Sequence, residues 1–157
     1  MRLETVRASC LLAVPMTEAW EFFSDPRNLS RITPPSLGMR VTSELPPKMH
    51  AGMIVTYTIT PFLRIPVRWV TEITHVSEPS FFVDEQRFGP YRFWHHQHHF
   101  READDGGTIV EDLVHYAVPF GLAGRAVGAT VVRRQLESIF AFRTRFLEQT
   151  FGAGPAR

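Results

Sequence analysis

The sequence predicts an α+β fold, in which a curved antiparallel sheet of about seven strands wraps around a long C-terminal helix, with two short helices after the first strand. Two observations carry this prediction. Short segments up to residue 118 alternate apolar and polar residues and are rich in Val, Ile, Thr, Phe and Tyr. From residue 122 to 151 the apolar residues instead recur every three or four positions, with no proline. A helix of this length extends roughly 40 Å, which makes it the one predicted element large enough to cover a face of the sheet.

Length and composition fit a single domain over residues 1–157. The chain has 157 residues, of which 44% are apolar and 21% charged, and this is typical of a folded globular protein. Its single cysteine, Cys10, excludes an internal disulfide framework and a multi-cysteine zinc site.

Charge and hydropathy exclude further classes of partner. Lys and Arg total 17 against 16 for Asp and Glu, and this formal charge of +1 gives no overall attraction to nucleic acid. No apolar run approaches the roughly 20 residues that span a bilayer. The N-terminal apolar stretch is too short for a signal peptide. We therefore expect a cytoplasmic protein with no nucleic-acid partner and no stable membrane insertion.

The N-terminal third begins with a strand and continues with two short helices. Residues 2–14 alternate, and one of their faces becomes steadily more apolar towards Leu12, as in a half-buried strand. Pro15 suits the first turn of a helix that ends near Ser24. Residues 26–33 predict a second short helix, because the prolines at 34 and 35 end it.

Six further strands are expected in the middle of the chain. They cover residues 38–45, 53–62, 67–76, 80–88, 91–102 and 108–118. Turn-forming Pro, Gly and Asp residues separate these segments. Short connections between consecutive strands predict an antiparallel meander.

The final helix is amphipathic. Its apolar positions are Val132, Leu136, Ile139, Phe140, Phe146 and Leu147. Its basic positions are Arg133, Arg134, Arg143 and Arg145, and we interpret them as a solvated face. Gly152 follows, where helices commonly end.

A stripe of polar residues runs through three neighbouring strands. Because alternate residues of a strand share a face, the sequence groups Phe82 with Asp84 and Gln86, Trp94 with His96, His98 and Phe100, and Asp112 with Tyr116. We expect these faces to point towards the long helix, together with Trp69 and Tyr57 on the preceding strands.

Buried polar groups must pair, hold water or contact a ligand. A pair of His96 or His98 with Asp112 or Asp84 is the simplest solution. Three interpretations follow: a structural hydrogen-bond network, the polar end of a ligand pocket, or general acid–base catalysis. For the last, the candidate catalytic residues are His96, His98 and Asp112. The His-x-His pairs lack a strong metal-binding spacing, so no metal and no other cofactor is expected, and the pair His95 and His99 is interpreted as a solvated face.

Two segments carry a resemblance to a known family. They are "FFVDEQRFGPYRFWHHQHHF" and "GTIVEDLVHYAVPFG", and the N-terminal "PMTEAWEFFSDPRNL" adds to them. In this element order they resemble the SRPBCC superfamily, the helix-grip domains of START lipid-transfer proteins, birch-pollen-type allergens and polyketide cyclases. The chain is most similar to the bacterial ligand-binding SRPBCC subfamily. The resemblance implies a helix-grip fold with a cavity between the sheet and the long helix, and it transfers no catalytic residue.

We therefore expect the chain to bind or carry a hydrophobic small molecule, such as a lipid, an isoprenoid or an aromatic polyketide-like compound. The expected ligand-binding residues are Trp69, Phe82, Asp84, Gln86, Trp94, His96, His98, Phe100, Asp112 and Tyr116. One alternative is an enzyme of the cyclase or dehydratase type that uses a cavity histidine as general acid or base. A second is a protein-interaction or stress-response module with a vestigial pocket. Both a monomer and a homodimer are compatible with the sequence.

Overall fold

The predicted fold class is confirmed by the computed structural model, which describes residues 3–60, 65–104, 106–119 and 128–154. Seven strands form one antiparallel sheet in the order β1-β7-β6-β5-β4-β3-β2. The strands are β1 (Glu4–Leu12), β2 (Arg40–Val41), β3 (Met53–Ile59), β4 (Val67–Ser77), β5 (Phe81–Phe88), β6 (Phe93–Glu102) and β7 (Thr108–Ala117). The helices are α1 (Met16–Phe23) and α3 (Gly128–Phe151), with the 3-10 turns η1 (Pro26–Asn28) and η2 (Pro35–Leu37).

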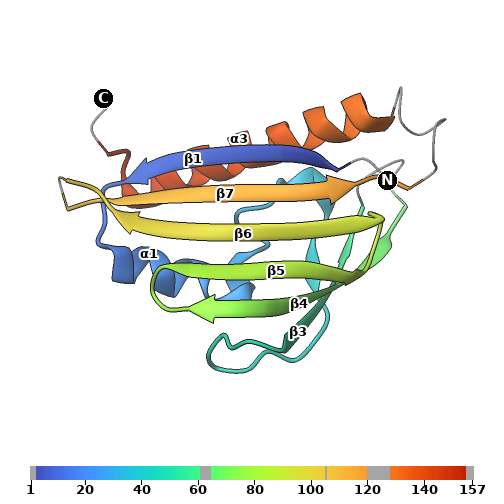
Figure 1. Cartoon of the computed structure of the whole chain (residues 1–157), viewed down its shortest axis with the longest axis horizontal. Helices are drawn as coiled ribbons and strands as arrows, with labels where there is room; N and C mark the ends of the chain where they lie inside the picture. The colour runs from blue at the N-terminus through green and yellow to red at the C-terminus, as the bar shows by residue number, and fades with distance from the viewer. Residues whose placement is uncertain (1–2, 61–64, 105, 120–127, 155–157) are drawn as a thin grey trace.

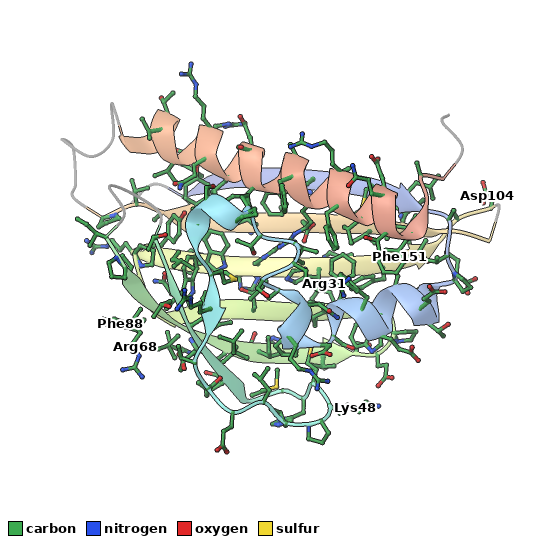
Figure 2. The ribbon with its side chains drawn as sticks, turned by 180° about the vertical axis from the view of Figure 1, so that it is seen from behind. Arg31, Lys48, Arg68, Phe88, Asp104 and Phe151 are labelled. Atoms are coloured by element: carbon green, nitrogen blue, oxygen red, sulfur yellow. The ribbon has the colours of Figure 1, made fainter. Side chains whose placement is uncertain are left out.

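The helices lie together on one face of the sheet. Figure 1 shows the other face of the sheet, and Figure 2 shows α1 and α3 in front of the strands when the molecule is seen from behind. α3 packs against β1, and α1 packs against β6. The apolar core therefore lies between the sheet and this helical layer.

Side-chain alternation explains why these segments form strands. On β6 the even-numbered residues from Trp94 to Phe100 are buried, whereas the odd-numbered residues from Phe93 to His99 are only half-buried. Tyr57 and Trp69 are buried and form a cross-strand pair between β3 and β4. The expected inward orientation of these faces is confirmed by their burial.

Two elements are shorter than predicted. The strand expected over 38–45 is reduced to Arg40–Val41, because the backbone N–H groups of Thr42 and Ser43 both donate to the carbonyl of Thr56, which ends the regular ladder. The second short helix is only the turn η1. The Asp25 carboxylate accepts the backbone N–H of Arg27 at its start, and the prolines at 34 and 35 begin η2.

The long helix presents an apolar stripe to the sheet. Leu136, Phe140 and Leu147 are buried on it. α3 begins at Gly128, and the predicted segment 122–127 lies outside the described residues, as do Phe120 and Gly121 of the second motif. Within the described part of the chain, no helix is long and apolar enough to cross a membrane.

Replacing Leu147 by Ala should lower the free energy of unfolding by about 2–5 kcal/mol, because Leu147 is 1% exposed and its removal leaves a cavity in the core. Val131→Ala on the same helix is the control, since Val131 is 48% exposed and should change stability by less than about 0.5 kcal/mol. Urea unfolding of both variants measures the difference. Equal losses would contradict the described packing of α3.

Candidate functional site

A cavity of about 150 Å³ lies between the sheet and the helical layer. Its wall is mainly aromatic and aliphatic. From α1, η1 and the segment that follows, it includes Phe22, Phe23, Leu29 and Ile32. From the sheet it includes Tyr57, Trp69, Ile73, Phe82 and Trp94, with Tyr91 from the β5–β6 connection, and from α3 it includes Leu136, Ile139 and Phe140. Such a wall favours an apolar ligand and leaves few groups to contact a polar one.

Six of the ten expected ligand-binding residues line this cavity. They are Trp69, Phe82, Asp84, Trp94, His96 and His98. Trp69 stacks on Tyr57 with ring centroids 5.6 Å apart and meets Trp94 edge to face at 5.2 Å. These contacts fix the indole rings by packing, so this part of the wall is formed before any ligand binds.

The other four expected residues lie outside the cavity wall. Gln86 hydrogen bonds to the backbone N–H and carbonyl of Tyr91, which orders the β5–β6 connection. Phe100 packs against Trp20 and Phe23 in the core.

Tyr116 is buried, meets Tyr91 edge to face and faces Trp94 across the ladder. Asp112 is buried behind the two histidines. These four residues support the wall of the cavity, and a role for any of them in ligand contact stays a prediction.

His96 and His98 are held between two carboxylates. His96 Nε2 lies 2.8 Å from Asp112 Oδ1, and His98 Nε2 lies 2.8 Å from Asp84 Oδ2. The remaining ring nitrogens face the opposite carboxylates, with His96 Nδ1 at 3.2 Å from Asp84 and His98 Nδ1 at 3.0 Å from Asp112. The strand register causes this arrangement, since Asp84 is paired with His96 across β5 and β6, and His98 with Asp112 across β6 and β7.

Arg143 completes this group, and the sequence analysis placed it wrongly. It was assigned to the solvated face of the helix, but it is 6% exposed, and its Nη1 lies 2.9 Å from Asp112 Oδ1. Its guanidinium also lies over the ring of Phe140. The spacing Leu136, Phe140, Arg143 and Leu147 puts the arginine within the apolar stripe, and this signal in the sequence could have identified it.

We call Asp84, His96, His98, Asp112 and Arg143 the charged cluster. Burial opposes ionisation of Asp112, but Arg143 and both histidines outweigh this effect and hold the pKa of Asp112 well below its usual value. Burial likewise opposes ionisation of Asp84, and the two histidines lower its pKa in the same way. Burial favours neutral His96, yet Asp84 and Asp112 raise its pKa. Both carboxylates are therefore ionised, and their charge must be compensated within the cluster.

Two buried side-chain nitrogens among the described residues have no hydrogen-bond partner: Trp69 Nε1 and Arg143 Nε. Both belong to residues that line the cavity. Leaving a buried donor unpaired costs roughly 1–3 kcal/mol. The cavity wall therefore offers hydrogen-bond donors to a molecule that brings an acceptor.

The expected solvated pair, His95 and His99, lies on the opposite face of β6. Both are half-buried and neither lines the cavity. His95 Nδ1 lies 2.7 Å from Glu85, and Gln97 connects the two histidines by hydrogen bonds. Their partners are therefore other side chains on this outer face, and they are separated from the charged cluster by the sheet.

One protein-family model matches most of the chain. Residues 12–140 match the family model described as polyketide cyclase / dehydrase and lipid transport. No curated protein matches the chain.

Solved structures with this fold cover nearly the whole chain. Protein Ms6760 from Mycobacterium smegmatis is 24% identical, with a TM-score of 0.65 over 96% of this chain and 98% of that one. A START superfamily protein from the same organism is 9% identical, with a TM-score of 0.71 over 94% and 96% of the two chains. The Zhui aromatase/cyclase from Streptomyces sp. R1128 is 15% identical, with a TM-score of 0.67 over 95% and 93%. At these identities the likeness establishes the fold alone.

Arg143→Met should lower the free energy of unfolding by about 3–5 kcal/mol, because it leaves the buried Asp112 carboxylate without its guanidinium partner. Arg145→Met, on the exposed face of the same helix, is the control and should have little effect. Adding Asp112→Asn to Arg143→Met should recover part of the loss, since the uncompensated charge is then removed. Equal stability of the two single variants in urea unfolding would contradict the charged cluster.

Proposed function

The chain belongs to this polyketide cyclase, dehydrase and lipid transport family, and we propose that it binds a hydrophobic small molecule in the cavity between the sheet and α3. The single observation that carries the proposal is the apolar, aromatic cavity whose wall also contains unpartnered buried donors. An apolar ligand gains free energy by leaving water, and an acceptor on the ligand satisfies the donors that the protein leaves unpaired.

Among the ligands expected from the sequence, the size and composition of the cavity favour an aromatic compound. A cavity of about 150 Å³ is the size that holds one aromatic ring when its wall is apolar. Trp69, Tyr57 and Trp94 offer ring faces and edges on one side of it. We therefore propose an aromatic compound with a carbonyl, hydroxyl or carboxylate oxygen, in preference to a long-chain lipid or an isoprenoid.

A second candidate function is acid–base catalysis at the same site. The buried pairs of His96 with Asp112 and of His98 with Asp84 support it, because a carboxylate that holds an imidazole can orient it for proton transfer. The cavity would exclude water from a reactive carbonyl compound. Both functions use one cavity, so the experiment must separate binding from turnover.

Native mass spectrometry of the purified protein, followed by organic extraction, should reveal a stoichiometric aromatic compound if the protein carries one. 4-Nitrophenol is a one-ring dye of the size that the cavity holds, and its use does not require the ligand to be known. Its visible absorption should shift on binding, and a ligand at 100 times its dissociation constant should add about 2.7 kcal/mol to stability. Ile139→Trp should abolish this binding, because Ile139 lines the cavity and an indole ring there fills it.

Val131→Trp places the same ring on an exposed position of α3 and is the matched control. Dye binding that is unchanged in Ile139→Trp, while both variants remain folded by circular dichroism, would contradict binding in this cavity.

His96→Ala separates the two candidate functions. In a carrier it should only weaken binding of the extracted compound, whereas in an enzyme it should abolish conversion of that compound while leaving measurable binding. Product analysis by mass spectrometry after incubation measures conversion, and displacement of the one-ring dye measures binding. Full turnover by the variant would exclude His96 as the general acid or base.

A further inference from the structure

We propose that Asp84, His96 and His98 bind a divalent transition-metal ion of the Zn²⁺ or Fe²⁺ class at the cavity wall. This inference goes beyond the binding of an apolar compound and does not depend on it. Within the described part of the chain, these three residues are the one group of at least three His, Cys, Asp or Glu side chains whose ligand atoms could share an ion. From the sequence no metal was expected, because the His-x-His pairs lack a strong metal-binding spacing.

The ligand atoms are close together before any ion is present. Asp84 Oδ2 lies 3.2 Å from His96 Nδ1 and 2.8 Å from His98 Nε2. One ligand atom from each of the three residues lies within 4.8 Å of the other two. In a tetrahedral site with bonds of about 2.0–2.1 Å, ligand atoms lie roughly 3.3 Å apart. A small outward movement of the three side chains would therefore admit the ion. Two imidazoles and one carboxylate are a common ligand set for zinc and for non-haem iron.

The outer ring nitrogens support this assignment independently of the ligand spacing. Histidines that bind a metal usually direct their other ring nitrogen to a carboxylate. Here His96 Nε2 lies 2.8 Å and His98 Nδ1 lies 3.0 Å from one oxygen of Asp112, which Arg143 holds at 2.9 Å. An ion on His98 Nε2 would leave the proton on Nδ1, the nitrogen that faces Asp112. Asp112 would then orient both histidines.

The carboxylate ligand is supported in the same way. Trp94 Nε1 donates to Asp84 Oδ1 at 3.1 Å, so the indole holds one carboxylate oxygen and leaves the other facing the histidines. Each of the three proposed ligands thus has an outer partner that fixes its orientation, as expected of a preformed metal site.

Charge and access predict what such an ion would bind. Asp84 and Asp112 contribute −2 and Arg143 contributes +1, so the cluster carries −1 when both histidines are neutral. A divalent ion changes this sum to +1, which an anionic oxygen ligand would neutralise. All three proposed ligands line the cavity, so an open coordination position would face a molecule bound there. A proton bound to one of the histidines would also compensate the negative charge of the cluster. The metal titrations described next distinguish a bound proton from a bound ion.

The test uses the whole chain, stripped of metal with EDTA and titrated with Co²⁺ without any organic ligand. One equivalent of Co²⁺ should produce the visible absorption of a low-symmetry nitrogen and oxygen site, and Zn²⁺ should displace it. Asp84→Asn and His98→Gln should each weaken Zn²⁺ binding by more than about 100-fold, whereas Asp112→Asn should weaken it by about 10–100-fold while one equivalent still binds.

The control is the double variant His95→Ala with His99→Ala. It removes a histidine pair from the same strand but from its outer face, and it should bind Zn²⁺ as the unchanged protein does. Two results would overturn the proposal: no Co²⁺ absorption in the folded, unchanged protein, or Zn²⁺ binding that is lost in the control and retained in Asp84→Asn. The Co²⁺ titration uses the protein without any substitution, so a variant that fails to fold does not decide the outcome. Failure here leaves dye binding in the cavity unaffected, which keeps this test distinct from that of the proposed function.

Discussion

The burial of two carboxylates beneath a cavity wall is the constraint on which much of this structure depends. Asp84 and Asp112 lie on strands that flank β6, so β6 supplies the groups between them, and Arg143 on α3 adds a second partner for Asp112. His96 and His98 fill this position, and each faces both carboxylates. A shift of β6 by one residue would turn both histidines to the outer face, so that Asp84 would lose both of its imidazole partners and Asp112 would keep only Arg143. The charged cluster therefore fixes the register of β5, β6 and β7.

The same constraint connects the helix to the sheet. Arg143 extends from α3 to Asp112, so the position of the helix is set by an ion pair as well as by apolar packing. Leu136 and Phe140 on one side and Leu147 on the other hold the apolar part of that contact. The cavity lies next to this ion pair and is lined by the same helix. A change in α3 that moved Arg143 would alter the cavity wall and the charge balance together.

Strand alternation made most of the fold and part of the site predictable from the sequence. The even-numbered face of β6 could be assigned because buried and half-buried residues alternate there without interruption. A pairing of His96 or His98 with Asp84 or Asp112 could be anticipated, because neighbouring strands of a meander are adjacent in space. The sequence could not predict which of the ten expected residues line the cavity. The lining depends on how the helical layer packs on the sheet. Phe100, for example, is covered by Trp20 and Phe23 of α1.

Arg143 shows the limit of judging residues by type. A charged residue on a helix is usually solvated, and this expectation was preferred to the position of Arg143 in the apolar stripe, which indicated burial. β2 shows a different limit: local composition favoured a strand, while backbone hydrogen bonds at Thr42 and Ser43 ended it after two residues. In each case the partner is distant in the sequence, Asp112 for Arg143 and Thr56 for the end of β2, and periodicity does not identify such a partner.

A contribution to stability alone does not explain the charged cluster. Replacing a buried ionic group by apolar side chains of similar volume is often neutral or stabilising, so a core without these charges would fold at least as well. Trp69 Nε1 nearby in the wall and Arg143 Nε in the cluster are without hydrogen-bond partners. A network retained only to fix strand register would be expected to satisfy its own donors. Donors left beside an apolar cavity are the groups that the proposed ligand would satisfy.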